Sequence, residues 1–141
     1  MSLASPNEVF LSHAHSDTDF ASLLVGTLRH RGVPVWFSQS NILGAQQWHD
    51  EIGDALQRCD WFAVVLSPEA VESRWVKREL VYALRENQYD NRIIPLLYKG
   101  CDYRKLSWML PDFQMVDFTG DFADGCRNLF RVWGLGYKER I

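Results

Sequence analysis

Two groups of residues in this sequence combine side-chain types and spacings that suit chemistry. His13, His15 and Asp17 form an H-x-H-x-D pattern directly after a short apolar segment. Imidazole and carboxylate groups are common zinc ligands, so the pattern is consistent with a metal site. Trp75 and Glu79 are four residues apart and would share one face of a helix. A carboxylate on the flank of a buried helix face can reach a ligand while its pKa is perturbed by burial.

The elements that must position these groups alternate between strand and helix. Short apolar segments predict strands at 8–11, 33–37, 61–66, 92–97 and 114–118. Helical spacing of apolar residues predicts a helix between Ser16 and Gly32, one around 48–59, a short one from Pro68, and longer ones over 73–87 and 122–133. This alternation is typical of stacked βαβ units and predicts a single α/β domain on a mostly parallel, five-stranded sheet.

Local signals mark several of the boundaries. Ser16, with an acidic residue three positions later, resembles a capping box, and Gly32 is expected to end the helix that follows. Ser67 and Pro68 are expected at the N-cap and first position of the short helix. Proline lacks the N–H that a sheet ladder needs, so Pro95 predicts an edge position or a bulge for the fourth strand.

Polar residues follow three of the predicted strands at the point where each ends. Ser12 and His13 follow the first strand, Ser38 the second and Ser67 the third. In open α/β sheets, ligands bind beyond the carboxyl ends of the strands. The helix after the third strand would bring Glu79 to the same edge. We therefore expect any functional site to lie there.

Composition argues against nucleic acid and membranes as partners and favours a cytoplasmic location. A net charge of −3 and a pI near 5.8 leave no basic footprint for nucleic acid. No run approaches the roughly 18 apolar residues of a membrane span, and no signal-peptide pattern is present, so we expect no membrane partner and a cytoplasmic location. The three cysteines form no C-x-x-C pair, which favours free thiols. We expect a disordered segment at 1–7, one domain over 8–134 and a tail at 135–141.

Three segments, in this order, resemble the sequence boxes of Toll/interleukin-1 receptor (TIR) domains. VFLSH at 9–13 resembles their opening box, and the loop over 38–48 resembles their BB loop. LSP at 66–68, followed by WVKREL at 75–80, resembles the segment that leads into their third helix. The resemblance covers residues 8–133 and is greater to bacterial members than to animal receptor tails. It implies a flavodoxin-like three-layer fold.

The resemblance also implies an activity. Some TIR domains cleave NAD⁺ at the nicotinamide–ribose bond, and their catalytic glutamate is the one in W-x-x-x-E, which is Glu79 here. NAD⁺ would then be a substrate, with no bound cofactor, and the products would be nicotinamide and ADP-ribose or a cyclic variant of it. Ser12, His13, Ser38 and Trp75 would bind the substrate around Glu79.

Self-association is a further implication of the resemblance. Other TIR domains, and above all second copies of this chain, are the expected protein partners. The expected interface residues are those at the tip of the BB loop, namely Asn41, Ile42, Leu43 and Gly44. The chain departs from many TIR enzymes in having Ser38 in place of an acidic residue. It also has His13 and His15 where several members have basic residues, so phosphate contacts are expected to be weaker or pH-dependent.

Two alternatives to NAD⁺ cleavage follow from the same residues. Other TIR domains only recruit further TIR domains, and the apolar residues at the loop tip would suit a non-catalytic interaction module. A metal-dependent hydrolase would use the H-x-H-x-D pattern, but a zinc site needs further ligands. Only His30 and His49 remain among the histidines, and both lie on predicted helices. The metal-dependent alternative is therefore the weaker of the two.

Overall fold

The sheet consists of five strands that all run parallel. The structure, a computed structural model, describes residues 5–37 and 45–135. Its strands are β1 (Val9–Ser12), β2 (Val35–Phe37), β3 (Trp61–Leu66), β4 (Ile93–Leu97) and β5 (Val116–Asp117). Their order across the sheet is β2-β1-β3-β4-β5, which places β1 and β3 side by side in the middle. The predicted α/β sheet is confirmed, and it is wholly rather than mostly parallel.

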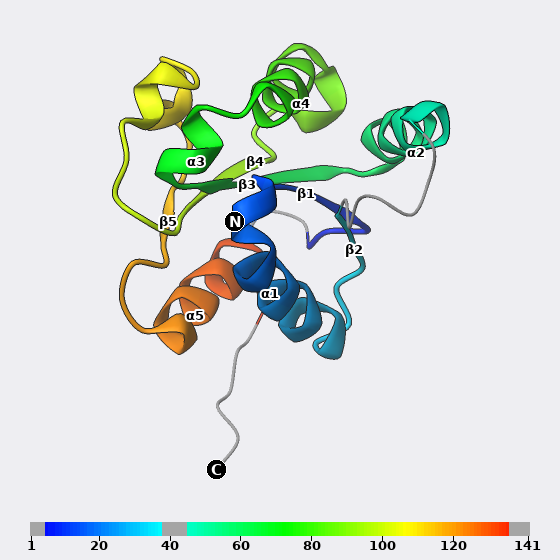
Figure 1. The fold of residues 1–141 in the computed structure, drawn as a ribbon. Helices are drawn as coiled ribbons and strands as arrows, with labels where there is room; N and C mark the ends of the chain where they lie inside the picture. Colours follow the sequence, from blue (N-terminus) through cyan, green and yellow to red (C-terminus); the bar gives the residue numbers. More distant parts are fainter. Residues whose placement is uncertain (1–4, 38–44, 136–141) are drawn as a thin grey trace.

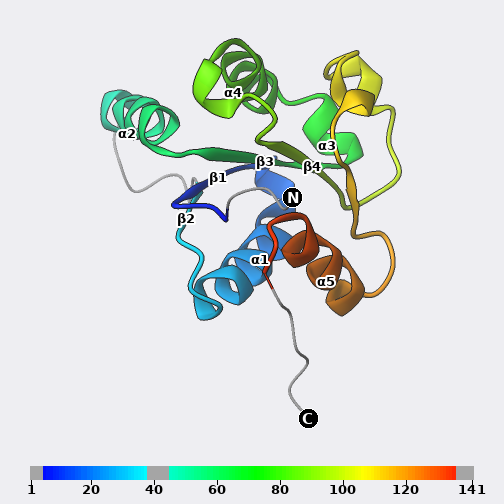
Figure 2. The ribbon, with the colours of Figure 1, turned by 180° about the vertical axis from the view of Figure 1, so that it is seen from behind.

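Helices cover both faces of this sheet (Figures 1 and 2). One face carries α1 (Thr18–His30) and α5 (Phe122–Val132). The other carries α2 (Ala45–Arg58), the short α3 (Pro68–Val71) and α4 (Arg74–Arg85). Single 3₁₀ turns occur at η1 (His15–Asp17), η2 (Asn87–Tyr89), η3 (Tyr103–Lys105) and η4 (Leu110–Asp112). The three layers match the flavodoxin-like arrangement that was expected.

Alternate residues of the central strands enter two separate cores. Val9 and Leu11 pack on the side of α1 and α5, whereas Phe10 packs on the side of α2 and α4. All six residues of β3 are buried, as expected of a strand that is covered on both faces. No helix in the described segments is long and apolar enough to cross a membrane.

Each predicted helix and strand is present, although several boundaries, such as the starts of α2, β2 and β5, differ by two or three residues from the predicted ones. Ser67 caps α3 through a 3.0 Å hydrogen bond from the Ala70 amide, as predicted. Gly32 follows α1 with a positive φ of 85°, which glycine adopts without strain. The prediction that Ser16 caps this helix is wrong, because Ser16 lies within η1 and α1 begins at Thr18.

The prediction of an edge position for the fourth strand is also wrong, because β4 lies between β3 and β5. The Arg92 carbonyl and the Tyr98 amide both form hydrogen bonds with β3. The backbone polar groups of the residues that alternate with them therefore face β5, and the Leu97 carbonyl accepts a hydrogen bond from the Phe118 amide on that side. Pro95 shares the orientation of Leu97. Pairing with β5 begins only opposite Leu96, so the N–H that Pro95 lacks has no ladder partner to lose.

Candidate functional site

A buried serine and a buried glutamate meet at the carboxyl edge of the sheet. Ser12 is the last residue of β1, and its hydroxyl donates a hydrogen bond of 2.6 Å to Glu79 Oε1. Ser12 is 1% exposed and Glu79 is 7% exposed. The two residues are 67 positions apart in the chain. The expectation that α4 brings Glu79 to the end of the first strand is therefore confirmed.

Local sequence explains why α4 presents Glu79 in this way. Ser73 caps the helix by accepting a 3.2 Å hydrogen bond from the Val76 amide. Val76, Leu80 and Ala83 recur at helical spacing and are buried against the sheet. Glu79 lies one position from Leu80, on the flank of this apolar stripe, where α4 packs against β1 and β3. Its carboxylate is therefore drawn into the protein beside the end of β1.

Burial controls the charge of this carboxylate. Removal from water raises the pKa of Glu79 from 4.5 to about 7, and the hydrogen bond from Ser12 opposes that rise. Glu79 is consequently divided between its protonated and ionised forms near neutral pH. A carboxylate in this state can change its charge over the physiological range, which an exposed glutamate does not do.

A second buried serine–carboxylate pair lies at the same edge. The Ser67 hydroxyl, just after β3, donates a hydrogen bond to Asp17 Oδ2. Burial raises the pKa of Asp17, while this hydrogen bond lowers it. Asp17 occupies the N-cap position of α1 but makes no capping bond, because its carboxylate is directed to Ser67. The loop after β1 is thus anchored at Ser12 and again at Asp17.

His13 lies between these two anchors and is half-buried. Its ring centroid is 5.7 Å from that of Phe37, and its Nε2 is 3.4 Å from the Thr18 hydroxyl oxygen. Burial, followed by the proximity of His15, lowers the pKa of His13 to about 4. Of the expected phosphate contacts, weaker or pH-dependent, a neutral His13 agrees with the weaker ones and not with a pH dependence near neutrality. At neutral pH, His13 offers a ring N–H and no positive charge.

Trp75 lies one helical turn before Glu79 and extends to the surface. It is 39% exposed, and the guanidinium carbon of Arg78 lies 5.6 Å from the centroid of its ring. The face that Trp75 and Glu79 share thus has an aromatic group at the surface and a carboxylate beneath it. A role for Trp75 in stacking on a ligand stays a prediction.

Ser38 and the loop-tip residues Asn41, Ile42, Leu43 and Gly44 lie outside the described residues. In the described part of the chain, no three histidine, cysteine, aspartate or glutamate side chains are grouped so as to hold a metal ion. The residues of the H-x-H-x-D pattern are instead divided, with Asp17 bonded to Ser67 and His13 near Thr18.

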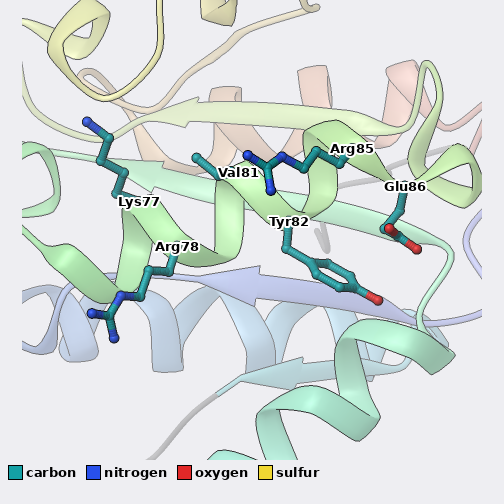
Figure 3. A pocket seen from close by; sticks show the side chains of 6 residues that line it. All are labelled: Lys77, Arg78, Val81, Tyr82, Arg85 and Glu86. Carbon is teal, nitrogen blue, oxygen red and sulfur yellow. The ribbon is translucent and has the colours of Figure 1, made fainter.

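A hollow that the sequence did not lead us to expect lies on the outer face of α4 (Figure 3). Its volume is about 500 Å³, and its walls are formed by Lys77, Arg78, Val81, Tyr82, Arg85 and Glu86. The signal for this hollow in the sequence is the helical spacing of basic residues and a tyrosine on the polar side of α4. Glu79 does not line this hollow, because its side chain is directed toward β1. The hollow and the serine–glutamate pair are therefore separate features.

Comparison with known proteins places this arrangement in context. A family model described as TIR domain matches residues 9–130. The chain is 31% identical over 99 residues to NAD(+) hydrolase PdTIR of Paracoccus denitrificans, an alignment that covers 68% of this chain and 33% of that protein. It is 26% identical over 102 residues to NAD(+) hydrolase TcpC of Escherichia coli, covering 71% and 33% of the two chains. The chain thus spans about a third of the length of these curated relatives.

A solved structure gives the same result for the fold. The TIR domain of the Toll-related receptor TRR-2 from Hydra magnipapillata superposes with a TM-score of 0.70 at 23% identity. The superposition covers 87% of this chain and 94% of that one. At this level of identity the likeness concerns the fold alone.

Proposed function

Because this chain belongs to the TIR domain family, whose model covers residues 9–130, we propose that it cleaves NAD⁺ at the nicotinamide–ribose bond, with Glu79 as the catalytic carboxylate. The observation that carries the proposal is the burial of Glu79 at the carboxyl edge of the sheet, where its pKa is raised to about 7. The names of two relatives, both NAD(+) hydrolases, support the same reaction.

The chemistry of the bond suits a single carboxylate. Cleavage passes through an oxocarbenium-like ribose, as in glycoside hydrolysis, and an ionised carboxylate stabilises the developing positive charge. Nicotinamide leaves as a neutral molecule with the bonding electron pair, so no general acid is needed. Water then adds to the ribose carbon and loses a proton, which gives ADP-ribose. A hydroxyl of the substrate in place of water would give a cyclic product.

Neighbouring residues have separate parts in this proposal. The surface-exposed ring of Trp75 would stack on the nicotinamide or the ribose, one helical turn from the carboxylate. Neutral His13 would donate a hydrogen bond to a ribose hydroxyl or a phosphate oxygen without adding charge. Ser38 would contribute a hydroxyl from the end of β2. NAD⁺ is consumed in this scheme, so no resident cofactor takes part.

Self-association forms part of the same proposal. A second copy of the chain, docked through the loop that contains Asn41, Ile42, Leu43 and Gly44, would complete the site. Specific activity is then expected to rise with protein concentration, or when the chain is fused to an oligomerising domain. Specific activity that stays constant over a hundredfold range of concentration would contradict this part of the proposal and leave the role of Glu79 intact.

The direct test of the activity is nicotinamide release from NAD⁺, followed by NMR with concentrated protein. We expect release by the wild-type chain and none by a folded Glu79→Ala variant. Release by both would retain the activity and overturn the assignment of Glu79. No release by either, at high concentration and under crowding, would favour the alternative of a non-catalytic interaction module.

A further inference from the structure

We propose that Ser12 is a positioning residue for Glu79, whose Oε1 it holds so that Oε2 is the oxygen presented to the substrate. The inference rests on the proposed function for the identity of the substrate. The geometry of the pair itself is independent of that proposal. Ser12 is paired in register with Val64 of β3, so its backbone is held by the neighbouring strand at the end of β1. Its hydroxyl is therefore offered to α4 from a rigid position.

The two oxygens of the Glu79 carboxylate differ in their surroundings. Oε1 accepts the 2.6 Å hydrogen bond from Ser12. Across residues 5–37 and 45–135, no side chain or amide donates to Oε2. In this part of the chain, the fully buried side-chain polar atoms that have no hydrogen-bond partner are the indole nitrogens of Trp61 and Trp133, and Oε2 is not among them. Among the described residues, Oε2 is therefore the carboxylate oxygen left to meet a ligand, and Glu79 as a whole keeps an exposed fraction of 7%.

This division of roles explains why the Ser12 hydroxyl is not itself a ligand donor. Its proton is directed to Glu79, and the residue is 1% exposed. A hydroxyl in this position favours the ionised form of the carboxylate and restricts its rotation. Both effects act on a substrate through Glu79 rather than by direct contact. The prediction that Ser12 binds substrate directly is the competing interpretation, and the kinetic experiment below distinguishes the two.

Among the described residues, no charged side chain is hydrogen-bonded to Glu79, whose partner is the neutral Ser12 hydroxyl. α4 packs against β1, β3 and α3, and the titratable side chains on or beside these elements include His13, Asp17, Glu69 and Glu72. Lys77 and Arg78 on α4 itself are exposed. Ser12 is thus the single described hydrogen-bond donor that favours the ionised form of this carboxylate against burial.

The test is the titration of Glu79 in the intact chain, with and without the hydroxyl. Glutamate labelled with ¹³C at the carboxyl carbon gives one NMR signal for each residue, and the Glu79→Gln variant assigns the signal of Glu79. We expect Ser12→Ala to raise the titration midpoint of Glu79 by about one pH unit or more, the usual effect of one hydrogen bond to a charged group. An unchanged midpoint in the folded variant would overturn the proposal.

Ser67→Ala is the matched control, because Ser67 is also a buried serine at the carboxyl edge that is bonded to a carboxylate. It is expected to leave the midpoint of Glu79 unchanged. An equal rise in both variants would show a general loosening of the edge and would contradict a specific role for Ser12. If Ser12→Ala does not fold, Ser12→Cys keeps a similar volume with a weaker donor, and a smaller rise in the same direction is expected.

Kinetics supply a second measurement. For nicotinamide release, Ser12→Ala is expected to move the rise of kcat/KM with pH upward by the same interval, and to lower kcat more than it raises KM at high pH. A rise in KM with kcat unchanged would instead indicate direct substrate binding by Ser12. If the wild-type chain releases no nicotinamide, the proposed function fails while the NMR titration still decides whether Ser12 controls Glu79.

Discussion

Replacing Glu79 by glutamine is expected to stabilise the protein at alkaline pH, although it removes the proposed catalytic group. The pKa of Glu79 rises from 4.5 to about 7 on folding, chiefly because the carboxylate is buried. The native state therefore binds this proton more tightly than the unfolded state does. Stability is lost as pH rises from 4.5 toward 7 and is constant above that range, so far as this group is concerned.

The magnitude follows from the two pKa values. Their difference is about 2.5 pH units, and at 1.36 kcal/mol per unit the ionised group costs about 3 kcal/mol above pH 7. The glutamine amide is neutral, has a nearly identical shape, and its oxygen can still accept the hydrogen bond from Ser12. Glu79→Gln is thus expected to raise the free energy of unfolding by about 3 kcal/mol at pH 8, but by only about 1 kcal/mol at pH 5.

Urea denaturation at the two pH values measures this difference. Glu72→Gln is the control, because Glu72 is exposed at the end of α3, and its effect is expected to be within about 0.5 kcal/mol at both pH values. A Glu79→Gln effect that is equal at pH 5 and pH 8 would refute the account of burial. So would a variant that is less stable than the wild type at pH 8.

Three further outcomes are expected. The kcat/KM for NAD⁺ cleavage should rise about tenfold between pH 6 and pH 8, because the ionised fraction of Glu79 rises about tenfold over this range when its pKa is about 7. A flat profile would show that the ionisation of Glu79 has no part in the reaction. Ser67→Ala should lower the free energy of unfolding by about 2 kcal/mol in urea denaturation, since it removes the cap of α3 and leaves a buried carboxylate unpaired. Gly125→Ala should lower the free energy of unfolding by about 1–3 kcal/mol, because the added methyl would overlap the Phe118 ring. Gly26→Ala in α1 is the control, because the added methyl meets no atom within 4 Å and should raise this free energy by up to about 1 kcal/mol. Similar effects of the two variants would contradict the packing of α5 on Phe118.

The sequence alone predicts the face on which Glu79 lies but not its partner. Its place beside the apolar stripe of α4 follows from helical spacing, which depends only on nearby residues. The hydrogen bond to Ser12 joins residues 67 positions apart, so it depends on how far α4 is inserted beside β1. The expected capping role of Ser16 fails for the same reason, because the loop before α1 is held by the long-range hydrogen bond between Ser67 and Asp17. For Ser16, a local capping pattern gives way to this tertiary contact, whereas for Glu79 the tertiary contact adds to a helical pattern that holds.

Two other differences have physical causes that the sequence does not display. Pro95 is compatible with an interior strand because β5 is only two residues long and begins opposite Leu96. The pKa of His13 is lowered because the ring is buried and His15 is close, which cannot be read from the residue type. The five-stranded α/β sheet with helices on both faces, by contrast, follows from the βαβ pattern and the family resemblance, and it is confirmed by the structure.

The most direct measurement of the central claim is the rate of nicotinamide release by the wild-type chain and by Glu79→Gln, at pH 8 and equal high concentration. The glutamine variant keeps the shape and an oxygen that accepts the hydrogen bond from Ser12, so the main difference between the two proteins is the negative charge. We expect the variant to be at least about 100-fold slower while remaining folded. Equal rates in the two proteins would show that the buried carboxylate does not stabilise the ribose cation and would contradict the account.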